Sequence, residues 1–136
     1  MTYIPDKLRV LVYQRAAGRC EYCLIHNQDT YKQHEVDHIV AEKHGGVTDA
    51  DNLCLSCFDC NRHKGSDLAS LDLDSQQVVL LFHPRRDSWV THFALEKALI
   101  VPQSPQGRAT IRLLQFNTPR RLAEREALHV MGQYPR

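Results

Sequence analysis

Two pairs of cysteines constrain the fold of this chain more than any other feature of its sequence. Cys20 and Cys23 form one Cys-x2-Cys turn, Cys57 and Cys60 form a second, and 33 residues lie between the two turns. Each turn places two sulfur atoms on one side of a small loop, so the two turns together can supply four ligands to one metal ion. Thiolates in a closed fourfold arrangement are typical of structural zinc. The sequence therefore predicts that the chain folds around a zinc ion.

A redox-active cysteine pair is the alternative use of such a turn. A redox pair normally begins a helix that follows a strand, whereas Cys20 follows Gly18, a glycine at the expected end of a helix. This order favours the metal site. The fifth cysteine, Cys54, lies between Leu53 and Leu55, and we expect it to be a small buried side chain rather than a ligand.

Composition favours a cytoplasmic protein with no membrane association. The 136 residues suit one domain or one domain with a small appendage. The longest apolar run, residues 78–82, is far too short to cross a membrane, and the N-terminus lacks the pattern of a secretory signal. Cysteines stay reduced in the cytoplasm, so the five cysteines of this chain point to metal binding before disulfides.

The net charge of +1 hides an uneven distribution along the chain. Residues 1–74 carry 8 basic and 12 acidic side chains, whereas residues 75–136 carry 9 basic and 4 acidic ones. Bound cations would offset much of the negative charge in the first part. The basic second part predicts a DNA-facing surface that includes Arg85 and Arg86. Arginines that are merely solvated are the competing interpretation.

The pattern of apolar residues, caps and turns predicts a mixed α+β chain. Thr118-Pro119 is a typical helix start, with threonine as the cap and proline in the first turn. The expected elements are a helix that opens at Pro5-Asp6, a strand over residues 34–40, a loop over 43–51 with Gly45-Gly46 as its flexible point, a helix within 52–65, strands over 76–82 and 89–95, and a final helix over 118–131.

Three short motifs accompany the cysteine turns. They are Asp37-His38, Asp51-Asn52-Leu53, and Asn61 to Gly65 directly after Cys60. Together with the cysteines they resemble the HNH endonuclease family, also called the ββα-metal nucleases, over residues 20–65, about a third of the chain. The resemblance implies a ββα-metal module within residues 1–70, stapled by the structural zinc. A small α+β extension over residues 71–136 would pack on it, similar to that of small bacterial, notably cyanobacterial, HNH proteins.

Hydrolysis of a phosphodiester bond explains why these residue types belong together. The attacking water must lose a proton, which a neutral imidazole can accept near pH 7. The phosphate and the leaving oxygen gain negative charge, which a divalent cation offsets, and a hard cation such as Mg²⁺ prefers oxygen ligands. The resemblance implies a metal-dependent DNA endonuclease that uses Mg²⁺ or Mn²⁺. His38 would be the general base, and Asp37 and Asn61 would hold the catalytic cation.

The resemblance also implies supporting roles for neighbouring residues. Asn52 would orient the adjoining loop and the imidazole of His38, and Arg62 and Lys64 are expected to contact DNA phosphates. Asp37 and His38 follow each other on a strand, so their side chains should point to opposite faces. Either a bulge or separate roles on the two sides of the strand are therefore expected.

Other interpretations stay open at this point. A zinc-stapled DNA-binding module without catalysis would keep the four cysteines, although it would not need Asp37, His38 or Asn61. A nuclease subunit that cuts only within a larger phage or restriction assembly would need them all, and the sequence identifies no protein partner. Asn61 also suits a turn after a zinc knuckle, Asn52 also suits a helix cap, and basic residues near a helix end are common.

Overall fold

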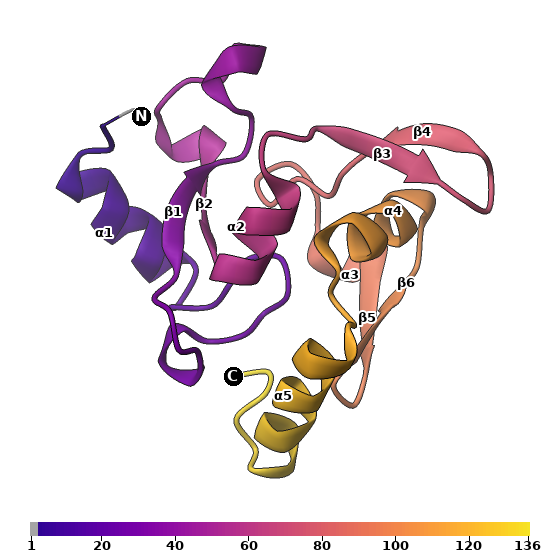
Figure 1. The fold of residues 1–136 in the computed structure, drawn as a ribbon. Coiled ribbons are helices and arrows are strands. Elements are labelled where there is room, and N and C mark those ends of the chain that lie inside the picture. The colour runs from indigo at the N-terminus through magenta and orange to yellow at the C-terminus, as the bar shows by residue number, and fades with distance from the viewer. Residues whose placement is uncertain (1–2) are drawn as a thin grey trace.

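An antiparallel β-hairpin followed by a helix forms the centre of the first half of the chain (Figure 1). The structure is a computed structural model that describes residues 3–136. Strand β1 (Glu35–His38) pairs with β2 (Leu53–Ser56), and α2 (Phe58–Lys64) follows directly. Helix α1 (Asp6–Arg15) precedes the hairpin and packs against it. The chain is therefore α+β, and the ββα order expected from the sequence is confirmed.

Local sequence signals set the ends of the two helices. Asp6 lies in the first turn of α1, where its charge complements the helix dipole. Ala17 and Gly18 adopt left-handed conformations, with φ values of 54° and 72°, which end α1 as the glycine predicted. At α2 the N-cap is Cys57, whose sulfur accepts a hydrogen bond from the backbone N–H of Cys60. The second cysteine turn is thus also the start of a helix.

Short 3-10 helices interrupt the loops around the hairpin. The loop between β1 and β2 contains η2 (Glu42–His44) and η3 (Ala50–Asn52), and η1 (Asn27–Asp29) lies before β1. Gly45 ends η2 in a left-handed conformation, with a φ of 91°. The loop expected over residues 43–51 is therefore present but largely made of ordered turns.

The register of the hairpin places Asp37 and His38 on opposite faces. Each residue of β1 from Glu35 to His38 has one partner on β2, so the alternation of side chains is regular. Leu53, opposite His38, belongs to a small core under α1, whereas Cys54, opposite Asp37, belongs to the larger core of the molecule. Of the two arrangements expected, the structure shows separate sides for the two residues.

Two further hairpins and three helices make up the second half of the chain. Helix α4 packs against β3, β6 and α2, and after α5 the chain turns back so that the C-terminus lies beside the first half (Figure 1). The bounds of these elements are β3 (Ala69–Asp72), β4 (Gln77–Leu80), α3 (Trp89–His92), β5 (Phe93–Glu96), β6 (Leu99–Pro102), α4 (Pro105–Leu114) and α5 (Pro119–Val130). Within this half β3 pairs with β4 and β5 pairs with β6, both antiparallel.

The prediction of a strand over residues 89–95 is wrong for residues 89–92. Residues 89–92 form the short helix α3, and the strand begins only at Phe93. Trp89 and Phe93 are four positions apart, which is the spacing of one helix face, and the centroids of their rings lie 5.1 Å apart. The indole N–H of Trp89 also donates to the carbonyl of Tyr22 at 2.8 Å. Aromatic packing across one turn therefore prevails over the β-propensity of these residues.

Helix α4 is an element that the sequence analysis does not predict. Ser104 caps it, since its Oγ accepts a hydrogen bond from the N–H of Gly107 at 2.9 Å, and Pro105 occupies the first turn. The same signal at Thr118 and Pro119 correctly predicts α5. The start of α4 could therefore have been predicted from the sequence.

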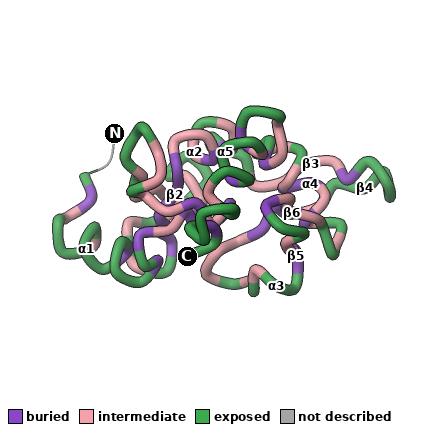
Figure 2. Tube along the Cα trace, turned by 90° about the horizontal axis from the view of Figure 1, so that it is seen from below, coloured by how far each residue is buried: buried purple, intermediate pink, exposed green. Residues whose placement is uncertain are grey.

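One large hydrophobic core joins the two halves of the chain. It contains Ile39 and Cys54 from the first half together with Phe82, Phe93 and Phe116 from the second. Figure 2 shows buried segments in the middle of the tube, between the exposed outer faces of α1 and β4. The boundary expected between residues 70 and 71 stays a prediction.

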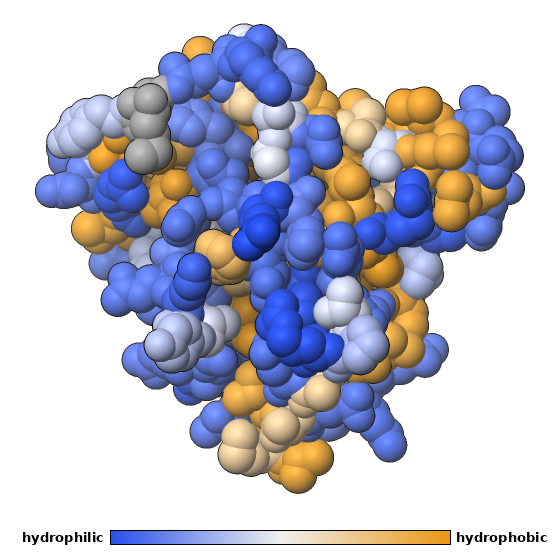
Figure 3. Space-filling view, viewed as in Figure 1, coloured by the Kyte–Doolittle hydropathy of each residue, from blue (hydrophilic) through white to orange (hydrophobic). Residues whose placement is uncertain are grey.

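The far end of the second half carries exposed apolar side chains. Leu73, Val78 and Leu80 lie on the β3–β4 hairpin and are more than half exposed, and Figure 3 shows apolar surface in this region at the upper right.

Over residues 3–136, no helix is long and apolar enough to cross a membrane.

Candidate metal centre and active site

The four cysteines of the two turns come together in the structure. The sulfur atoms of Cys20, Cys23, Cys57 and Cys60 all lie within 4.8 Å of one another, and all four residues are buried. The sulfurs of Cys23 and Cys57 are 3.7 Å apart. Zinc–sulfur bonds of about 2.3 Å in a regular tetrahedron place neighbouring sulfurs about 3.8 Å apart. The cluster predicted from the sequence therefore forms and fits a structural zinc ion.

The two turns reach the cluster through the same local geometry. The N–H of Cys23 donates to the sulfur of Cys20 at 3.5 Å, and the N–H of Cys60 donates to the sulfur of Cys57 at 3.4 Å. Each turn thus uses a backbone N–H to support the charge of its first sulfur. The thiolate is the form of cysteine that binds metal.

Cys54 lies outside the cluster, as expected. It is fully buried on β2, and its thiol contacts the hydroxyl of Tyr22 at 3.7 Å. Burial raises the pKa of Cys54 to about 12, which keeps it a neutral thiol. It is a packing residue between the two zinc turns.

His38 is held by a residue that the sequence analysis does not single out. Its Nε2 lies 2.8 Å from Oγ1 of Thr48, in the loop between β1 and β2, and the side chain of His38 is half-buried. A hydroxyl at this distance holds the orientation of the ring, and it can accept a proton from Nε2 or donate one to it. The contact spans ten positions across a loop, so no spacing rule would have pointed to Thr48.

Asn52 ties the same loop together. Its Oδ1 accepts from the N–H of Val40, and its Nδ2 donates to the carbonyls of Val40 and Val47, each at 2.9 Å. The side chain therefore holds the loop next to Thr48. This agrees with one of the two roles that the resemblance implies for Asn52, the orientation of the adjoining loop. A direct contact with the imidazole stays a prediction.

Gly46 is needed for its size rather than for flexibility. A Cβ at this position would lie 1.7 Å from the carbonyl oxygen of Val40 and 2.9 Å from Nδ2 of Asn52. The loop therefore passes directly over the Val40–Asn52 contact. Only glycine fits at position 46, so the lack of space for a side chain explains this residue of the Gly45-Gly46 pair.

Asp37 and Lys64 lie on the helix side of the hairpin. Burial raises the pKa of Asp37, while the charge of Lys64 partly opposes that rise. Burial likewise lowers the pKa of Lys64, and Asp37 opposes it. The Nζ of Lys64 donates to the carbonyl of Ile39 at 2.8 Å, and the residue is only 4% exposed. Lys64 therefore joins α2 to the end of β1, and the phosphate contact expected from the sequence stays a prediction.

Asn61 contacts a carboxylate that the sequence analysis overlooks. Its Nδ2 donates to Oε2 of Glu35 at 2.6 Å. Glu35 and Asp37 are two positions apart on β1 and thus share one face. Asn61 on α2 therefore reaches the same side of the hairpin as Asp37, and its side-chain NH2 group is engaged by Glu35.

Most arginines of the second half hold the fold together. Arg85 forms an ion pair with Glu21, and its side chain is 15% exposed. Glu21 also accepts the N–H of Leu55 on β2 at 2.8 Å, so Arg85 supports the hairpin. Arg62 and Arg86 are exposed, and the DNA contacts expected of Arg62, Arg85 and Arg86 stay predictions.

Three other arginines are also engaged. Arg108 makes two hydrogen bonds to Asp72, at 2.8 and 2.9 Å. Arg120 bonds to Asp59 at 2.9 Å, and Arg121 is buried against the cysteine cluster. Each of these three arginines therefore makes contacts within the protein.

Comparison with known proteins gives one match. A family model described as HNH endonuclease matches residues 20–67. Neither the curated proteins nor the solved structures contain a match to this chain. The matched segment begins at the first zinc-turn cysteine and ends just after α2, so it covers the hairpin, the helix and the cysteine cluster. The match to the HNH endonuclease family therefore covers residues 20–67, about a third of the chain, and this segment contains the four-cysteine cluster.

Proposed function

We propose that the protein is a metal-dependent DNA endonuclease and that His38 is its general base. One observation carries this proposal. The segment that matches the HNH family holds the imidazole of His38 against Thr48 on a half-buried surface, within a hairpin that the cysteine cluster anchors. A positioned imidazole of this kind is what proton removal from a water molecule requires.

The contact with Thr48 supports a role for Nδ1 of His38 as the proton acceptor. When Nε2 carries the proton and donates it to Oγ1 of Thr48, Nδ1 keeps its lone pair and can accept a proton from water. Asn52 keeps Thr48 in place through the loop. In this account Thr48 and Asn52 are positioning residues, and His38 alone takes the proton.

Oxygen atoms on the other side of β1 suit a hard cation. Asp37 supplies a partly buried carboxylate, and Asn61, whose amide nitrogen contacts Glu35 on the same face, would supply its carbonyl oxygen. This donor set fits Mg²⁺ or Mn²⁺. When bound there, the cation would offset the charge of the phosphate and of the leaving oxygen. Glu35 would hold the amide of Asn61 so that its oxygen stays free for the ion.

Substitutions of Asp37 and Asn61 test this site. Asp37→Ala removes the charged ligand, so plasmid cleavage should need a much higher Mg²⁺ concentration. Asn61→Asp keeps an oxygen and adds a charge, so some cleavage should remain and the preference between Mg²⁺ and Mn²⁺ should change. Glu35→Gln is the control, because it keeps an oxygen that can accept the hydrogen bond from Asn61. If the metal titration curves of Asp37→Ala and Asn61→Asp both coincide with that of the parent protein, Asp37 and Asn61 are not ligands of the catalytic cation.

The two adjacent arginines of the second half should behave differently on DNA. Arg86→Ala should lower the slope of log Kd against log salt by about one, because one phosphate contact is lost. Arg85→Ala should leave that slope unchanged and instead lower the free energy of unfolding by about 1–3 kcal/mol, because it leaves the half-buried Glu21 without its ion-pair partner. Fluorescence anisotropy with duplex DNA at several salt concentrations and urea unfolding measure the two effects. Equal slopes for all three proteins would place Arg86 outside the DNA interface.

A further inference from the structure

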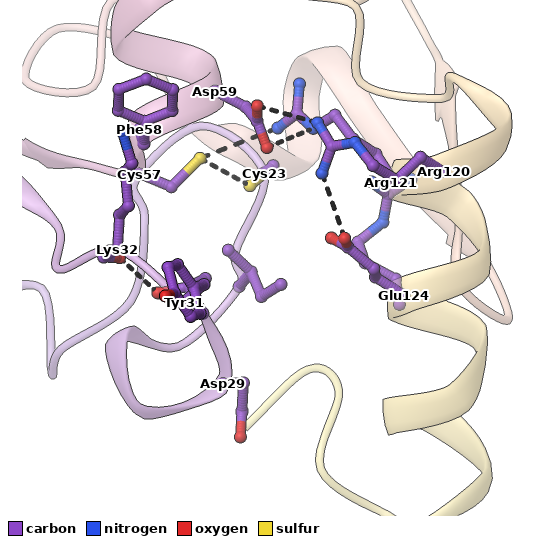
Figure 4. A pocket seen from close by; sticks show the side chains of 13 residues that line it. Cys23, Asp29, Tyr31, Lys32, Cys57, Phe58, Asp59, Arg120, Arg121 and Glu124 are labelled. Carbon is purple, nitrogen blue, oxygen red and sulfur yellow. Dashed lines mark hydrogen bonds and ion pairs between the residues drawn. The ribbon is translucent and has the colours of Figure 1, made fainter.

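The last helix and the C-terminal tail lie across both zinc turns. In Figure 4 the guanidinium of Arg121, on α5, points at the sulfurs of the cluster. Its Nη2 donates to the sulfur of Cys60 at 3.1 Å and to the sulfur of Cys57 at 3.7 Å. Arg121 is only 3% exposed. A residue 61 positions away along the chain thus contacts two of the four metal ligands directly.

The other nitrogens of Arg121 keep the guanidinium in place. Its Nη1 donates to the carbonyls of Leu114 and Gln115, at 2.7 and 2.9 Å, at the end of α4. Its Nε lies 3.7 Å from a carboxylate oxygen of Asp59. A buried cation is stable only when it is paired, and the thiolates supply the nearest negative charge to Nη2. Zinc with four thiolates carries a net charge of −2, so one guanidinium compensates half of it.

The tail fastens the other zinc turn. The hydroxyl of Tyr134 donates to the carbonyl of Cys23 at 2.7 Å, and Tyr134 is buried. Arg136 makes two hydrogen bonds of 3.0 Å to Asp29, in the segment that follows the first turn. The guanidinium of Arg125 lies 5.8 Å from the centre of the Tyr134 ring. Residues 119–136 therefore contact both cysteine turns through separate side chains.

We propose that residues 119–136, called here the C-terminal clamp, retain the zinc ion. Arg121 is a positioning residue that compensates the charge of the thiolates and fixes Cys57 and Cys60, while Tyr134 fixes the turn of Cys23. The dependence runs both ways: the clamp slows zinc loss, and the metal-bound turns provide the surface on which the clamp docks. This role concerns the C-terminal extension and is independent of whether the domain cuts DNA.

The rate of zinc release to a chromogenic chelator tests the clamp. Arg121→Gln should release zinc about 10–100-fold faster than the parent, the size of effect that outer partners of metal ligands have on metal affinity. Arg120→Gln is the matched control, because Arg120 lies next to Arg121 on α5 but its side chain is 59% exposed and bonds to the carboxylates of Asp59 and Glu124. It should release zinc within about twofold of the parent. Tyr134→Phe should accelerate release less than Arg121→Gln, because it removes one hydrogen bond from a backbone carbonyl.

Hydrogen exchange on the parent protein provides a second measurement that needs no variant to fold. Removal of zinc by a chelator should increase amide exchange in residues 119–136 earlier than in residues 105–114 of α4. If Arg121→Gln does not fold, Arg121→Lys takes its place, because it keeps the charge but cannot reach the sulfurs and the α4 carbonyls together. Zinc release at the parental rate in the glutamine or lysine variant would overturn the proposal. Unchanged protection of residues 119–136 after zinc removal would also overturn it.

Discussion

Cys57→Ser should abolish stoichiometric zinc binding and loosen the whole HNH domain. Cys57 is both one of the four clustered sulfurs and the N-cap of α2. The binding free energy of a structural zinc site is on the order of 10 kcal/mol, which is comparable with the entire stability of a domain, about 5–15 kcal/mol. Loss of the ion therefore removes most of what holds the two turns together. Elemental analysis and thermal unfolding measure the change.

Cys54→Ala provides the control for this prediction. Cys54 is buried between the same elements but lies outside the cluster, so the variant should keep its zinc and show only a modest cost for a small cavity. Should Cys57→Ser retain a full equivalent of zinc and melt like the parent, the four-cysteine assignment would be wrong.

His38→Ala should reduce cleavage of plasmid DNA by about 10²–10⁴-fold, the usual contribution of a general base. The imidazole is half-buried on the edge of the hairpin, and its contact with Thr48 is the one that we infer fixes its active tautomer. The substitution leaves the cysteine cluster and the proposed Asp37–Asn61 cation site untouched. Zinc content, DNA affinity and metal requirement should therefore stay close to those of the parent.

Thr48→Val separates positioning from proton transfer at the same ring. It removes the hydroxyl that faces Nε2 but keeps His38 itself, so the loss of activity should be smaller than that of His38→Ala. A Thr48→Val protein that is fully active would show that the ring needs no such support, while leaving the role of His38 in place.

The features readable from the sequence are those that depend on local spacing. The two cysteine turns, the cap of α5 at Thr118 and the end of α1 at Gly18 all follow from residues within one or two turns of one another. The Ser104-Pro105 start of α4 was equally local and could have been found.

The contacts that the sequence could not reveal join distant positions. Thr48 reaches His38, Glu35 reaches Asn61 over 26 positions, and Arg121 reaches Cys60 over 61 positions. None of these pairs has a periodicity or a spacing rule, because tertiary packing alone brings them together. The contacts of the arginines in residues 75–136 are of the same kind, because most of these side chains pair with carboxylates, sulfurs or backbone carbonyls that no spacing rule identifies.

Incubation of the purified protein with supercoiled plasmid tests the central claim most directly. The parent and His38→Ala proteins would be compared at equal zinc content, with Mg²⁺ or Mn²⁺ and with a chelator of divalent cations under conditions that leave the structural zinc bound. The account predicts nicked or linear DNA from the parent only when Mg²⁺ or Mn²⁺ is present, and almost none from His38→Ala. A His38→Ala protein that cuts the plasmid as fast as the parent would contradict it.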